Sequence, residues 1–431
     1  MPGRYSGLPG CTPEAKMCDS LGAVMSELAI LGTYSVFLAS YVVFALGKFP
    51  GMKIDRPGAA IIGAVLMFMT GAVRVENSLR LIHFGTIVLL FSMMLVVAYL
   101  HLAGFFDWVT ELVVTQLKPH HLLPTVIFLS GLLSAFFVND IICLVMVPFV
   151  LKVTGRMGIK PIPYLLAVAT ASNIGSTATI TGNPQNMLIG SFSDIGYRDF
   201  LWHLGPVALA GLFLDWFVLW WLYFRGQVHD VRTEPVVNAV QIEHAALLKA
   251  GIVAALVLAG FLAGFSPALV ASVGAAVLLI TRTRDPHLVY DEVDWGLLVF
   301  FVGLFLIVGG AENAGLTRHL LGFGERFNLQ HLGVFTLVTA ILSNLVSNVP
   351  AVMLLKSLVS QFANTHSAWL TLAMASTLAG NLTITGSVAN IIVVERAQKE
   401  AVITFLDYFR IGLPVTLLTL LVGWLWLSWI R

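Results

Sequence analysis

The chain has 431 residues, of which 58% are hydrophobic and 11% are charged, and its formal net charge is +1. This composition excludes an ordinary soluble domain, and the scattered Lys and Arg residues exclude a nucleic-acid-binding surface. Apolar runs long enough to cross a hydrocarbon core of about 30 Å recur along the chain, most clearly over residues 27–47, 83–103, 245–264 and 410–430. We therefore expect an all-α, multi-pass protein of the cell membrane, in direct contact with the lipid bilayer.

Charged and Pro/Gly-rich connectors divide the chain into two halves. We expect a polar N-terminal tail over residues 1–26 and a first repeat over residues 27–225. A cytoplasmic linker over residues 226–244 then leads into a second repeat over residues 245–431. This organisation predicts two related units joined by the most polar internal segment.

Matching segments in the two halves indicate an internal duplication. Residues 179–186 and 383–390 share the pattern T-I-T-G-x-x-x-N. A Ser also precedes Asn139 and Asn348 at the same spacing. Because both order and spacing are shared, a repeated structural unit explains the matches better than chance.

Residues 122–151 and 333–361 are expected to be re-entrant hairpins, which enter and leave the membrane on one face. Each half then retains about five full spans. With this topology most basic connector residues, among them Lys152, Arg156 and Lys160, fall on one side, which the positive-inside rule assigns to the cytoplasm. An odd number of spans inverts the second half relative to the first, as in many secondary transporters. Both termini are then expected outside.

Residues 163–191 and 368–395 are expected to be broken helices. Gly175, Gly182 and Pro184 interrupt the first of them, and Ser, Thr and Asn crowd its centre. Irregular backbone at membrane depth is tolerated only where protein or a water-filled cavity satisfies its polar groups, so a break of this kind indicates a binding site. The alternative is that the small residues only permit close helix packing. Recurrence of the break in both halves favours binding.

The expected binding residues lie at the hairpin tips and in the two breaks. They are Asn139, Ser172, Asn173, Gly175, Thr177, Thr181, Gly182, Asn183, Asn186, Ser347, Asn348, Asn381, Thr383, Thr385, Gly386, Ser387 and Asn390. A sodium site is expected near Asn139, Asn173 and Asn348 if sodium is the coupling ion. Half-helix N-termini in these breaks suit anions, and freed carbonyls and hydroxyls suit a small cation.

Asp140 is the candidate carrier of a coupling proton, because burial favours the protonated form of a carboxyl group. The alternative is that Asp140 caps a helix at the hairpin turn. Asp215, within an apolar aromatic segment, is a weaker candidate for the same role. Lys356 lies inside the second hairpin, where we expect it to snorkel to the interface. The alternative is that Lys356 compensates charge in alternation with substrate or proton. Glu312 is expected to face water.

Enzymatic activity is not expected. The sequence has no P-loop, HExxH or GxSxG pattern, so direct ATP hydrolysis by this chain is also not expected. Cys11, Cys18 and Cys143 lack the spacing of a metal site. We expect no cofactor other than a proton or sodium as coupling ion.

These motifs resemble the ion transporter superfamily, and within it the arsenite-permease branch that includes plant silicon-efflux transporters and bacterial anion permeases. The resemblance rests on residues 138–140, 143–144 and 148, and on residues 171–176 running into residues 182–186. It implies a scaffold region and a mobile transport region containing both hairpins and both broken helices. It also implies a homodimer and elevator-type alternating access.

The resemblance further implies that Asn139, Asn173, Asn348 and residues 383–387 line the substrate and coupling-ion sites. Dicarboxylate and citrate members carry Ser-Asn-Thr at the hairpin tips, whereas this chain has Val-Asn-Asp and Ser-Asn-Val. We therefore predict proton-coupled export of a small metalloid oxyacid or inorganic anion, such as arsenite or silicic acid. The alternatives are sodium-coupled carboxylate or sulfate transport, sodium/proton exchange, a channel, and the membrane subunit of a pump with a separate ATPase partner.

Overall fold

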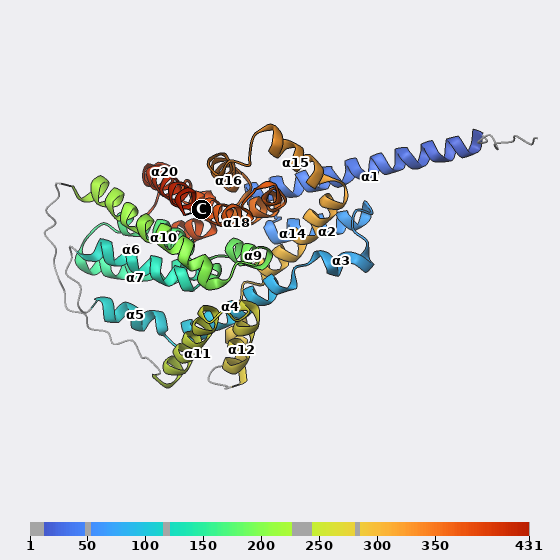
Figure 1. Cartoon of the computed structure of the whole chain (residues 1–431). Coiled ribbons are helices and arrows are strands. Elements are labelled where there is room, and N and C mark those ends of the chain that lie inside the picture. Colours follow the sequence, from blue (N-terminus) through green and yellow to red (C-terminus); the bar gives the residue numbers. More distant parts are fainter. Residues whose placement is uncertain (1–12, 48–52, 115–120, 226–243, 281–284, 431) are drawn as a thin grey trace, which may run out of the picture.

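The computed structural model describes residues 13–47, 53–114, 121–225, 244–280 and 285–430, and its regular elements there are all helices (Figure 1). The all-α prediction is thus confirmed. The expected linker lies outside the described residues apart from His244, the first residue of α11. The helices long and apolar enough to span a membrane are Glu27–Leu46, Phe84–Leu102, Tyr197–Phe224, His244–Leu262, Trp295–Asn313 and Phe405–Trp429.

The first half runs from α1 to η3. Its elements are α1 (Pro13–Leu46), α2 (Arg56–Met69), α3 (Val75–Leu81), α4 (Phe84–Leu102), α5 (Phe105–Val114), α6 (Leu122–Phe136), α7 (Asn139–Met157), α8 (Ile162–Ser176), η2 (Ile180–Gly182), α9 (Pro184–Phe192), α10 (Tyr197–Leu219) and η3 (Trp220–Phe224). Helix α1 begins inside the expected polar tail, so residues 13–26 are helical. Figure 1 shows the start of α1 extending away from the other helices.

The second half repeats this order of elements. It contains α11 (His244–Leu262), α12 (Pro267–Ile280), α13 (Pro286–Asp291), α14 (Trp295–Asn313), α15 (Leu316–Arg326), α16 (Leu332–Val346), α17 (Asn348–Leu355), η4 (Lys356–Gln361), α18 (Thr365–Ala379), η5 (Ile384–Gly386), α19 (Val388–Ala397) and α20 (Phe405–Trp429). Each predicted hairpin region is a pair of helices joined by a short turn, and each predicted broken helix is two helices separated by a 3-10 turn.

Contacts between the halves are reciprocal. Helix α2 packs along α14, and α4 packs along α12, while α10 packs along α20. Gly303 of α14 permits one of these contacts, because a Cβ there would lie 2.6 Å from the carbonyl oxygen of Ala60 in α2. In the first two pairs, an early helix of each half packs on a later helix of the other, so the two halves are joined along several helices.

Candidate functional site

The two breaks have the same backbone conformation. Thr179 has φ −136° and ψ 164°, and its counterpart Thr383 has φ −137° and ψ 162°. The glycine of each T-I-T-G motif is required by close approach of the chain to itself. A Cβ on Gly182 would overlap the carbonyl oxygen of Ser176, and a Cβ on Gly386 would lie 2.8 Å from that of Gly380. The repeated sequence therefore encodes a repeated local structure.

A side-chain amide satisfies the backbone in each break. Asn186 donates to the carbonyl oxygens of Ser176 at 3.1 Å and Thr179 at 3.0 Å. Asn390 donates to the equivalent carbonyls in the second half, at 2.7 and 3.0 Å. Buried carbonyls that leave the helical pattern need such donors, so these two asparagines hold the breaks in shape.

Asn173 links the two halves at the centre. Its side-chain oxygen accepts from Asn139 Nδ2 at 3.0 Å and from Ser387 Oγ at 2.9 Å. Its side-chain nitrogen donates to Asn381 Oδ1 and Asn390 Oδ1, both at 2.9 Å. All five side chains are buried. The tip of the first hairpin, the first broken helix and the second broken helix therefore share one hydrogen-bond network.

Thr377 stands in the second half where Asn173 stands in the first. Its hydroxyl donates to Asn186 Oδ1 at 3.3 Å, and accepts from Asn183 Nδ2 at 3.2 Å and from Gln185 Nε2 at 3.3 Å. Neither Thr377 nor Gln185 is among the binding residues predicted from the sequence. The signal was present for Thr377, which precedes its T-I-T-G motif by the same distance as Asn173 precedes the other.

A cavity of about 240 Å³ lies beside this network. Five of the predicted binding and coupling residues line it, namely Asn139, Asp140, Ser347, Asn348 and Ser387. The other lining residues were not among the predicted binding residues, and they are Arg56, Pro57, Pro184, Gln185, Asp294, Gly296, Leu297, Phe300, Val349 and Val388. The cavity thus lies between both hairpin tips, both breaks and the first turns of α2 and α14.

Four helices of the hairpins and breaks begin at the cavity wall. The first residues of α7, α9, α17 and α19 are Asn139, Pro184, Asn348 and Val388, and each of them lines the cavity. The N-terminus of a helix carries unpaired N–H groups and the positive end of its dipole. This wall can therefore donate hydrogen bonds to oxygen atoms of a solute.

Three ionisable side chains complete the wall: Arg56, Asp140 and Asp294. Arg56 Nε donates to the carbonyl oxygen of Phe44 at 3.1 Å, which anchors the guanidinium group. Asp294 caps α14 by accepting from the backbone nitrogen of Leu297 at 2.9 Å. The N-cap of α7 is Val138, so Asp140 is not the N-cap residue of that helix.

The other predicted binding residues do not line the cavity and have contacts within the protein. These residues are Ser172, Asn173, Gly175, Thr177, Thr181, Gly182, Asn183, Asn186, Asn381, Thr383, Thr385, Gly386 and Asn390. Thr181 Oγ1 lies 2.8 Å from the hydroxyl of Tyr197, for example. Gly175 packs against α6, where a Cβ would overlap the backbone of Gly131. In this structure such residues position the cavity-lining groups.

Asp215 is fully buried in α10, away from the cavity. The hydroxyl oxygen of Thr170 lies 3.0 Å from Asp215 Oδ2 and 2.9 Å from the carbonyl oxygen of Leu166. A hydroxyl has one proton, and a carbonyl can only accept. The Thr170 hydroxyl can therefore donate either to Asp215 Oδ2 or to the carbonyl oxygen of Leu166, but not to both at once. Asp215 Oδ1 has no hydrogen-bond partner in the described part of the chain.

Lys356 forms an ion pair with Glu312. Its Nζ lies 3.3 Å from Glu312 Oε1, and 4.9 Å from the ring centroid of Phe192. The side chains of Lys356 and Glu312 are 21% and 30% exposed. The pair joins the end of the second hairpin to α14, a contact that was not predicted from the sequence.

The apolar spans, the paired hairpins and breaks, and the cavity between them define a multi-pass membrane transporter. The Citrate transporter family model matches residues 41–379, so the chain belongs to this family and is not an enzyme. This confirms the predicted resemblance at the level of the superfamily.

Individual relatives cover nearly the whole chain. The silicon efflux transporter LSI3 of Oryza sativa subsp. japonica is 29% identical over 89% of this chain and 95% of its own length. A Dictyostelium discoideum protein named as the transporter arsB is 25% identical over 86% of this chain and 87% of its own length. The crystal structure of the Alcanivorax borkumensis YdaH transporter matches with a TM-score of 0.57 at 17% identity, covering 94% and 98% of the two chains, and supports the fold.

Proposed function

We propose that the protein is a proton-coupled secondary transporter that exports a small hydroxylated solute, with silicic acid and arsenite the leading candidates. The observation that carries this proposal is the chemistry of the cavity wall, where amides, hydroxyls and four helix N-termini surround a single basic residue, Arg56. Neutral oxyacids both donate and accept hydrogen bonds, which such a wall can satisfy without a countercharge. The similarity to a silicon efflux transporter supports the same substrate class.

Asp140 is the proposed carrier of the coupling proton. It lines the cavity beside Asn139, whose amide donates to Asn173 and thereby joins the network between the two halves. Loss of the proton from Asp140 would change the charge at the solute site itself. Solute and proton would then influence one another directly, which is the requirement for coupling.

The proposed transport cycle is of the elevator type. In this scheme the hairpins and broken helices move together against a scaffold that includes α2 and α14, and the cavity lies at their boundary. We further propose inverted repeats, a homodimer, a plasma-membrane or inner-membrane location, and both termini outside. These features follow from the sequence topology and the family resemblance.

A sodium-coupled carboxylate transporter is the second candidate. It is favoured by the guanidinium group of Arg56 beside four helix N-termini, an arrangement suited to a carboxylate. Under this alternative, a sodium ion would occupy oxygens near Asn139, Asn173 and Asn348. Under this alternative Asp140 carries no coupling proton. Replacement of Asp140 would then leave sodium-driven transport unchanged.

The test compares Asp140→Asn with a matched control, Asp215→Asn, in proteoliposomes. Both variants remove one membrane carboxyl group, but only Asp140 lines the cavity. We expect Asp140→Asn to abolish silicic acid or arsenite flux driven by a pH gradient while retaining solute exchange. Asp215→Asn should retain driven flux, because Asp215 lies away from the cavity and the oxygen of an amide can still accept from the Thr170 hydroxyl. Full pH-driven flux by Asp140→Asn would refute the proton assignment.

A further inference from the structure

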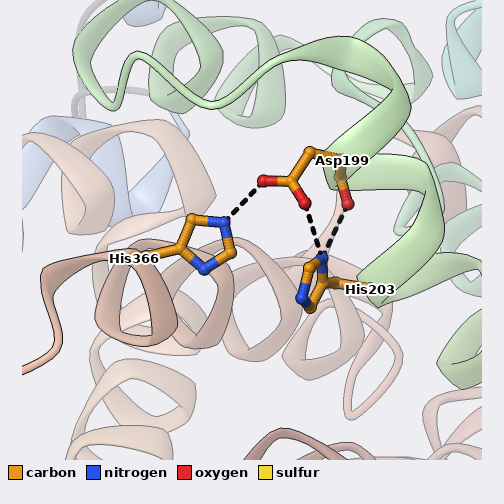
Figure 2. Close-up of side chains that lie close together, drawn as sticks. All are labelled: Asp199, His203 and His366. Carbon is orange, nitrogen blue, oxygen red and sulfur yellow. Dashed lines mark hydrogen bonds and ion pairs between the residues drawn. The ribbon is translucent and has the colours of Figure 1, made fainter. Parts of the chain in front are cut away.

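Three side chains that can ligate a metal meet where α10 and α18 begin (Figure 2). Asp199 Oδ2 lies 2.6 Å from His366 Nε2, and Asp199 Oδ1 lies 3.1 Å from His203 Nδ1. The three residues each offer one ligand atom, and these atoms lie within 4.8 Å of one another. We infer that the cluster binds one divalent transition-metal ion of the zinc type, at a site separate from the solute cavity.

The surrounding structure holds the three ligands in place. Asp199 and His203 are one turn apart on α10, so both side chains lie on one face of the helix. The backbone carbonyl of His203 accepts from Trp426 Nε1 at 2.8 Å, which fixes α10 against α20. Asn364 caps the start of α18 by accepting from the backbone nitrogen of Ser367 at 3.0 Å, and this positions His366. The site therefore needs little ordering when an ion enters.

The ligand set selects the class of metal. Two imidazole nitrogens and one carboxylate oxygen suit zinc and neighbouring transition metals, whereas calcium and magnesium prefer oxygen ligands alone. Tetrahedral zinc at bond lengths of about 2.0–2.1 Å places ligand atoms about 3.4 Å apart. The observed separations of 2.6 and 3.1 Å, which involve different oxygens of Asp199, would have to increase by less than about 1 Å. The other separations lie within 4.8 Å and would have to decrease by no more than about 1.4 Å. Side-chain exposures of 45%, 21% and 39% for Asp199, His203 and His366 leave room for water as a fourth ligand.

Proton balance also permits the ion to enter. His203 Nδ1 lies 2.8 Å from the backbone carbonyl oxygen of Asp199 and also near the carboxylate of Asp199, so this nitrogen donates. When the ion binds, a neutral imidazole moves its single proton to the other ring nitrogen. No proton is released, and the metal replaces the hydrogen bonds at the shared carboxylate. The bound ion would tie α10 to α18, the helix whose opposite end carries Thr377 beside the central network.

An ordinary histidine–carboxylate pair elsewhere provides the matched control. His101 Nδ1 lies 3.2 Å from Glu292 Oε2, and these side chains are 40% and 39% exposed. In the described part of the chain, no third metal-ligating side chain joins them. Comparing zinc binding after substitution of His101 with that after substitution of His203 or His366 distinguishes a three-ligand site from a histidine–carboxylate pair.

The experiment is zinc titration by calorimetry of the purified full chain without a polyhistidine tag, and its readout does not depend on transport. We expect one zinc ion per chain, and a loss of affinity of about tenfold or more in His203→Gln and His366→Gln. His101→Gln should bind as the wild type does. Cobalt substitution should give the visible spectrum of a tetrahedral site in the wild type and not in His366→Gln, provided that both elute as monodisperse protein.

Two results would overturn the inference. One is absence of saturable zinc binding by the monodisperse wild-type protein. The other is binding that survives both His203→Gln and His366→Gln. Neither result bears on the solute or on proton coupling, because those depend on the separate cavity.

Discussion

Asn173→Ala tests whether the central amide network stabilises the transporter. The substitution removes the partner of four groups, on Asn139, Ser387, Asn381 and Asn390. Each buried group left without a partner costs about 1–3 kcal/mol. If all four groups stayed without a partner, the free energy of unfolding would fall by about 4–12 kcal/mol. Asn139 and Ser387 line the cavity, where water can replace the lost partner. The oxygens of Asn381 and Asn390 remain buried, so we expect a net loss of about 2–6 kcal/mol.

Chemical unfolding of the purified protein in detergent measures this loss. Asn313→Ala is the control, because its single side-chain hydrogen bond, to the carbonyl oxygen of Ala72 at 3.0 Å, is exposed to solvent. That variant should lose less than about 1 kcal/mol. The prediction that the network stabilises the transporter would be wrong if Asn173→Ala were as stable as Asn313→Ala and bound solute as tightly as the wild type.

Three other substitutions test particular contacts. Gly175→Ala should destabilise the protein by about 3 kcal/mol or more, because its methyl group would overlap the backbone of Gly131, and unchanged unfolding would contradict the close contact of α6 and α8. Ser347→Gly should stabilise it by about 1 kcal/mol, since Ser347 has φ 78° and ψ 158°, a region that favours glycine, and a lower midpoint of unfolding would argue against this strain. Lys356 and Glu312 are both partly exposed, so a double-mutant cycle should give a coupling free energy of about 1 kcal/mol or less. A value several-fold larger would mean that the pair is more deeply buried than in this structure.

The breaks could be predicted because their causes are local. Gly182 and Pro184 cannot continue a helix, and the second break repeats the motif of the first at residues 383–390. The structure gives both breaks nearly identical backbone angles. The hairpin tips were located for a similar reason, since Asn139 and Asn348 are polar residues within apolar runs.

The remaining part of the cavity wall depends on tertiary packing. Arg56 and Asp294 begin α2 and α14, and these positions are far apart in the sequence. They become neighbours of the hairpin tips only because α2 packs along α14. Local composition does not predict a contact between helices that are far apart in the sequence. The pairing of Lys356 with Glu312 was not predicted for the same reason.

Helix ends were also less predictable than helix centres. The first hairpin was expected to end at residue 151, but α7 continues to Met157 and stops where Gly158 adopts φ 65°. A left-handed glycine is a common helix terminator. Polar residues in the last turns of α7, such as Lys152 and Arg156, suggested a connector, although they are compatible with a helix that extends beyond the apolar region.

Solute flux in proteoliposomes under an imposed pH gradient tests the central claim most directly. Silicic acid, arsenite, sulfate and succinate would be compared, each with and without sodium. The proposed function predicts that silicic acid or arsenite moves in response to the pH gradient, that collapse of the gradient stops this movement, and that sodium has no effect. Sodium-dependent movement of succinate or sulfate, with no response of the oxyacids to pH, would contradict it and would favour the sodium-coupled alternative.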